Sequence, residues 1–139
     1  MPDHDPPPTA IAPWLSVRHG TAAVDFYVAA LGAVELHRVA NDDGEIVCQL
    51  AVDGAEFWVS DEPDASPAAL GRGSARMILS VADPDALFDR AVAAGATVIA
   101  PMYEAHGWRI GRIADPEGHH WFFATHVRDV SPEDMKAHA

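Results

Sequence analysis

The sequence predicts an α+β fold made of two tandem βαβββ modules. The order strand, helix and three strands can be followed twice along the 139 residues, with polar, glycine-containing turns between the strands. The ends of the two helices also match, because residues 29–34 (AALGAV) align with residues 93–98 (AAGATV) after a one-residue slip. A chain of this length, 49% hydrophobic, suits one domain that buries roughly 68% of its unfolded surface. The sequence is therefore an internal duplication within a single domain.

The first module is expected over about residues 9–62. Its helix is predicted over residues 21–31, where apolar residues recur at i, i+3, i+4 and i+7 from Val24 and Gly32 supplies the stop. The strands of this module are expected at residues 11–17, 34–39, 45–52 and 56–60. Pro13 confines the first strand to an edge or an irregular position, because proline cannot donate a ladder hydrogen bond.

The second module repeats this order over about residues 74–127. Its helix has strong start signals, with Asp83 as N-cap, Pro84 at the first helical position and Asp85 in the first turn. The helix is expected to end at Gly95. The strands of this module are expected at residues 75–81, 97–100, 108–114 and 120–125. Together the modules give a single domain over residues 9–127.

The ends and the charge of the chain limit its environment and partners. Residues 1–8 are expected to form a flexible leader, and residues 128–139 a tail with a short helix that starts at Ser131. The leader has no basic cluster or apolar stretch, so we expect a cytoplasmic protein without a membrane partner. Nine Lys and Arg against 21 Asp and Glu give a net charge of −12, which argues against nucleic acid. The single cysteine, Cys48, cannot form an intrachain disulfide.

Several short motifs follow one another in an order that is specific as a set. They are PWLSV at 13–17, DFY at 25–27 with LGA at 31–33, RAVAAGA at 90–96, DPEGH at 115–119 and ATHV at 124–127. In this order the chain resembles the vicinal oxygen chelate superfamily, which includes glyoxalases, bleomycin resistance proteins and extradiol dioxygenases. The resemblance covers nearly the whole chain after Pro8. It implies the glyoxalase/bleomycin resistance/dihydroxybiphenyl dioxygenase fold, in which curved mixed sheets surround a cup and helices pack on their convex side.

The resemblance also implies where a catalytic metal would bind. Metal-dependent members place His, Gln or Glu on the first, fourth, fifth and eighth strands, facing into the cup. The matching positions here are Ala12, Trp58, Arg76 and Phe122. None of these side chains offers a lone pair to a cation, so we expect no metal and no cofactor. A two-residue shift brings Glu56 and His120 to the same face, but two ligands alone make a poor site.

Strand alternation predicts which side chains line the cup. The expected lining residues are Trp14, Gln49, Trp58, Arg76, Trp108, His120 and Phe122. Trp121 alternates with His120 and Phe122, so it is assigned to the core. A cup lined with aromatic rings suits a flat ligand, because each stacking contact adds about 0.5–1.5 kcal/mol beyond area burial.

These observations leave several functions open. The first is a metal-free protein that sequesters a small, partly aromatic molecule such as an antibiotic or metabolite, as bleomycin resistance relatives do. The alternative is an enzyme of glyoxalase, dioxygenase, lyase or isomerase type with unorthodox or no metal ligands. In that case Glu56 and His120 are weak candidates for proton transfer. A third possibility is a scaffold with an empty cup. A homodimer is expected because relatives pair their modules across a two-fold axis, within or between chains.

Overall fold

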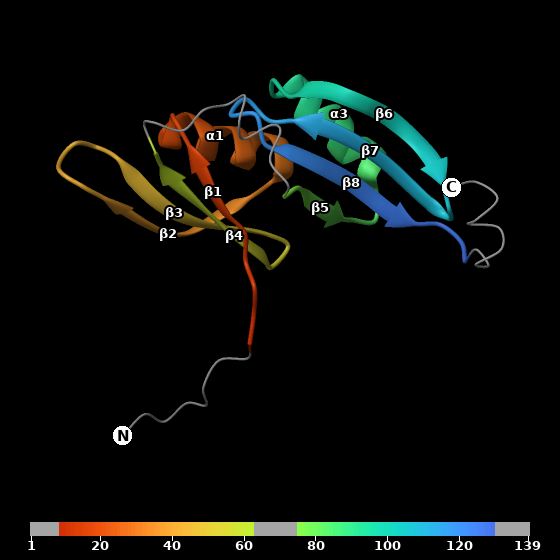
Figure 1. The fold of residues 1–139 in the computed structure, drawn as a ribbon, viewed down its shortest axis with the longest axis horizontal. Helices are drawn as coiled ribbons and strands as arrows, with labels where there is room; N and C mark the ends of the chain where they lie inside the picture. Colours follow the sequence, from red (N-terminus) through yellow and green to blue (C-terminus); the bar gives the residue numbers. More distant parts are fainter. Residues whose placement is uncertain (1–8, 63–74, 130–139) are drawn as a thin grey trace.

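The structure is a computed structural model and describes residues 9–62 and 75–129. These residues form two four-stranded mixed sheets, here called sheet A and sheet B, each accompanied by a helix (Figure 1). Sheet A has the order β1 (Trp14–Val17), β4 (Ala55–Asp61), β3 (Ile46–Val52) and β2 (Val34–Ala40). Sheet B has the order β5 (Met77–Ser80), β8 (His120–His126), β7 (Trp108–Ala114) and β6 (Thr97–Ala105). The helices are α1 (Gly20–Leu31) and α3 (Pro84–Ala93).

The predicted fold class of two βαβββ modules is confirmed. Both modules pair their first and fourth strands in parallel, β1 with β4 and β5 with β8, and the remaining neighbours are antiparallel. Each helix makes the crossover that a parallel pair requires. Within the described ranges, no helix has both the length and the apolar character needed to cross a membrane.

Two strand boundaries differ most from the sequence prediction. The first strand begins at Trp14 rather than at residue 11, because Pro13 contributes only its carbonyl, which accepts from the Trp58 N–H at 2.9 Å. The sixth strand continues to Ala105 instead of stopping at residue 100. Pro101 is tolerated there because β6 is an edge strand whose pairing with β7 shifts register on both sides of Ala100. The expected leader lies outside the described residues, as does the start of the tail helix.

One hydrophobic core joins the two modules. Tyr27 from α1, Phe57 from β4 and Trp121 from β8 are buried and form a triangle of ring contacts with centroids 5.3–5.6 Å apart. The helices are neighbours across the module boundary (Figure 1), and Arg90 Nε in α3 donates to the Ala29 carbonyl of α1 at 2.7 Å. The two modules therefore meet on the sides of the sheets that face the helices.

A buried carboxylate strengthens this junction. Asp115, which follows β7, is 4% exposed and accepts hydrogen bonds from the Tyr27 hydroxyl at 2.5 Å and from Trp121 Nε1 at 2.9 Å. Burial, followed by the nearby charge of Asp115, raises the pKa of Tyr27 well above its usual range. The phenol therefore stays protonated and keeps its role as the donor across the module boundary.

Trp121→Ala tests the importance of this junction. We expect it to cost about 3–5 kcal/mol of unfolding free energy, because it opens a cavity in the shared core and removes a donor to Asp115. Trp14→Ala is the matched control, since Trp14 is 54% exposed and loses mainly one ring contact, worth at most about 1.5 kcal/mol. Urea unfolding of both variants measures the difference. Equal losses would show that Trp121 has no special role in joining the modules.

Candidate functional site

Each sheet has one face against the helices and a second face, here called its open face, that points away from them. In β4, Phe57 and Val59 are buried against the core, whereas Trp58 between them is only half-buried. In β8, Trp121 and Phe123 are buried, whereas Phe122 is half-buried. The strand period of two therefore puts aromatic rings on both faces of each sheet, with different exposure.

The open face of sheet A carries a stacked pair of tryptophans. Parallel pairing of β1 and β4 sets Trp14 opposite Trp58, and their rings stack with centroids 5.8 Å apart and planes inclined by 17°. Gln49 of β3 is the next neighbour of Trp58, and its Nε2 donates to Glu56 Oε1 at 2.7 Å. Sheet A thus offers a flat aromatic surface with a polar amide–carboxylate pair beside it.

The open face of sheet B carries a cation, an imidazole and a ring. Phe122 of β8 lies between Ile78 of β5 and Arg112 of β7, and the Arg112 guanidinium carbon is 5.3 Å from the Phe122 ring centroid. Arg112 Nε donates to His120 Nδ1 at 2.9 Å, and Nη2 also approaches this nitrogen. Desolvation, followed by the charges of Arg112 and Arg76, lowers the pKa of His120. The imidazole is therefore neutral at neutral pH.

Arg112 was not among the residues predicted to line the cup. A signal for it was present, because Arg112 alternates with Gly111 and Ile113 in β7 and so shares a face with Phe122 on the next strand. Its partnership with His120 depends on the register between β7 and β8, which the sequence pattern alone does not determine.

The other predicted lining residues occupy two further places. Arg76 lines a cavity of about 260 Å³ between the start of β4 and residues 77–79 of β5, together with Glu56, Phe57 and Trp121. Trp108 lies at the start of β7, where its ring centroid is 5.1 Å from that of His126. Within one chain, the predicted lining residues therefore divide into Trp14, Gln49 and Trp58 on sheet A, His120 and Phe122 on sheet B, Arg76 in the cavity and Trp108 at the start of β7.

The residues present do not fit the divalent metal of metal-dependent relatives. Trp58 and Phe122 provide no lone pair, and Arg76 is permanently cationic. The two replacement candidates are also unsuitable, since His120 Nδ1 already accepts from Arg112 and Glu56 is exposed and bonded to Gln49. In residues 9–62 and 75–129, no group of three or more His, Cys, Asp or Glu could hold a metal ion.

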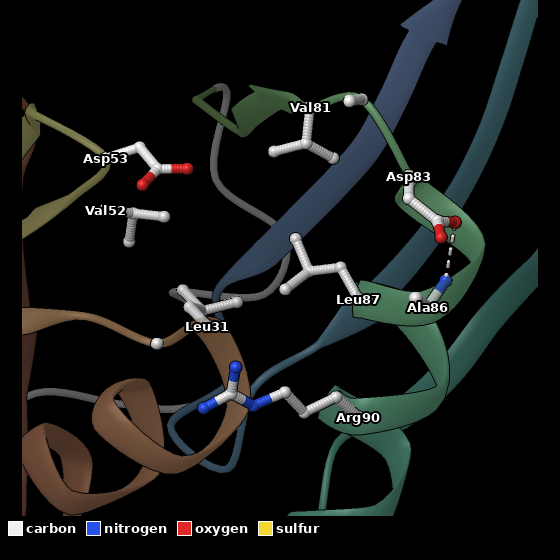
Figure 2. Close-up of a pocket in the computed structure, with 10 residues that line it drawn as sticks. Leu31, Val52, Asp53, Val81, Asp83, Ala86, Leu87 and Arg90 are labelled. Carbon is white, nitrogen blue, oxygen red and sulfur yellow. Dashed lines mark hydrogen bonds between the residues drawn. The ribbon is translucent and has the colours of Figure 1, made fainter.

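A larger cavity, of about 450 Å³, lies between the two modules on the helix side (Figure 2). Its apolar wall is formed by Leu31, Val52, Val81 and Leu87. Two of its polar groups serve the helices, because Asp83 accepts from the Ala86 N–H as the N-cap of α3 and Arg90 bonds to the Ala29 carbonyl. This cavity arises from the packing of α3 against α1, which the sequence pattern does not reveal.

Comparison with known proteins identifies the family to which this fold belongs. A family model described as a glyoxalase-like domain matches residues 14–123. An uncharacterised protein of Mycobacterium bovis is 37% identical over 137 residues, covering 92% of this chain and 90% of the relative.

Solved structures agree with the family match. TioX from Micromonospora sp. ML1 is 28% identical, with a TM-score of 0.67 over 88% of this chain and 100% of TioX. A glyoxylase/bleomycin resistance protein/dioxygenase domain from Frankia sp. EAN1pec shares the fold, with a TM-score of 0.70 at 18% identity over 87% of this chain and 93% of that domain. The chain is therefore a member of the glyoxalase-like domain family, within the vicinal oxygen chelate superfamily.

Proposed function

We propose that this protein binds a small, partly aromatic molecule without a metal, and that sequestration of that molecule is its function. The observation that carries the proposal is the Trp14–Trp58 stack on the open face of sheet A. Large aromatic side chains left partly exposed in a stacked pair are typical of a binding surface, because the fold gains little from them.

The stacked tryptophans favour a flat ligand. An aromatic ring laid on the exposed side of Trp14 would extend the stack and gain about 0.5–1.5 kcal/mol beyond area burial. Gln49 and Glu56 stand beside the stack, where an amide and a carboxylate can orient a ligand by hydrogen bonds. An apolar platform with few convergent polar groups is the usual composition of a small-molecule site.

The alternative of an enzyme has less support. Because Arg112 donates to His120 Nδ1, the neutral imidazole carries its proton on Nε2 and can donate but not accept a proton there. Glu56 is exposed, so it lacks the apolar surroundings that prepare a carboxylate as a general base. Neither residue is therefore prepared to remove a proton from a substrate.

We also propose a homodimer in which a second chain completes the cup. The two open faces belong to different sheets, whose opposite faces are joined through the helices and the shared core. A two-fold axis would set sheet A of one chain against sheet B of the other and form two identical cups. The exposed apolar residues of the edge strand β2, Val34, Leu36 and Val39, give further surface for such an assembly.

Elemental analysis of the purified protein should detect no stoichiometric divalent metal, because the ligand positions hold Trp58, Arg76, Phe122 and Ala12. Binding of a flat aromatic compound should also be unchanged by a chelator. One equivalent of Zn, Ni, Fe or Mn per chain would contradict the proposal.

Trp58→Ala should weaken binding of naphthamide, a neutral flat aromatic probe, by about tenfold, since it removes the ring that holds Trp14 in position and contributes to the stack. Trp58→Phe is the matched control, because it keeps a ring at the same place and should retain most of the affinity. Ligand-observed NMR titration measures both. Full affinity in Trp58→Ala would show that the tryptophan stack is not the binding surface.

Sedimentation equilibrium at micromolar concentration should give about twice the 14.9 kDa chain mass, as expected for an isologous dimer. A single 14.9 kDa species at that concentration would rule out the shared cup.

A further inference from the structure

We infer that the ligand carries an oxyanion, such as a carboxylate, and that Arg112 binds this group while the flat part of the ligand rests on Phe122. This inference depends on the proposed binding function and adds the chemical class of the ligand. It concerns the open face of sheet B, which in the proposed dimer faces the tryptophan stack of the second chain across the same cup.

Arg112 has no carboxylate partner among the described residues, although the protein is strongly acidic. The chain has 21 Asp and Glu and a net charge of −12, so acidic partners are abundant. Arg109, three residues earlier in β7, is bound by Asp85 through two hydrogen bonds of 2.6 and 2.8 Å. Among the residues that the structure describes, Arg112 has no such partner and donates instead to neutral His120.

His120 holds the guanidinium of Arg112 in a fixed orientation. Nε and Nη2 both approach His120 Nδ1, so one edge of the fork is used to fix the group in place. The other edge, formed by Nη1 and Nη2, still carries parallel N–H donors, and no described residue accepts from it. Two parallel donors match the two oxygens of a carboxylate, which is the geometry that makes arginine selective for such groups.

The free edge of the Arg112 guanidinium lies in partly buried, partly apolar surroundings. Arg112, His120 and Phe122 are half-buried, and Ile78, 66% exposed, stands on the other side of Phe122. Partial burial weakens solvent screening, and neutral His120 leaves the charge of Arg112 uncompensated. Desolvation lowers the pKa of His120 most, and the charges of Arg112 and Arg76 lower it further, so the imidazole stays neutral beside Arg112. A ring on Phe122 and Ile78 would hold its oxyanion next to Arg112.

The test compares naphthoate with naphthamide, which have the same ring system and differ in charge. Wild-type protein should bind naphthoate at least about tenfold more tightly than naphthamide at low ionic strength, with the difference decreasing as salt is added. Arg112→Gln should remove this preference, lowering naphthoate affinity about tenfold and changing naphthamide affinity by less than about twofold. Calorimetry or ligand-observed NMR gives both affinities.

Two further variants keep the test decisive. Arg109→Gln is the matched control, because it removes a cation from the same strand on the opposite face and should leave the preference for naphthoate intact. Arg112→Lys keeps the charge without the two-donor edge, so an intermediate preference is expected even if Arg112→Gln does not fold. Equal binding of both probes by wild-type protein would overturn the oxyanion inference alone. Failure of both probes to bind would overturn the proposed binding function with it.

Discussion

The arrangement of the two modules depends on the buried carboxylate of Asp115. Its oxygens accept from the Tyr27 hydroxyl, from Trp121 Nε1 and from the backbone N–H groups of Glu117 and His119. A buried carboxylate without partners would cost several kcal/mol, whereas one with four donors can stabilise the position of each. Because Tyr27 belongs to the first module and the other donors to the second, this single group links both halves of the duplicated chain.

The position of this junction determines which surfaces of the two sheets remain available for a ligand. The same loop makes three further side-chain contacts with the first module. Glu117 accepts from the Arg18 N–H at 2.6 Å and lies 3.2 Å from His19 Nδ1, and a ring nitrogen of His119 lies 2.9 Å from the Ser16 carbonyl oxygen. All of these contacts lie where the helices and the shared core meet. Neither the Trp14–Trp58 stack nor Arg112 takes part in these contacts, and both therefore remain available for a ligand.

The sequence was sufficient to predict the order of elements and the direction of most strand side chains, because both depend on local periodicity. Trp121 in the core and Trp58 on the other face follow from alternation alone. The continuation of β6 through Pro101 was missed, since an isolated sequence does not reveal which strand lies at an edge. The role of Asp115 and the Arg112–His120 contact were also missed, because they depend on register and on packing between distant segments.

The two arginines of β7 show how alternation separates structural from binding groups. Arg109 shares the helix-facing side of the strand with Ile113, and Asp85 at the start of α3 neutralises it. Arg112 faces the other way, where neither helix can offer a carboxylate, and a neutral imidazole fixes its orientation without compensating its charge. An identical side chain thus stabilises the fold at one position and keeps free donors at the other. No described residue offers Arg112 a carboxylate, so its free donors suit an oxyanion brought by a bound ligand.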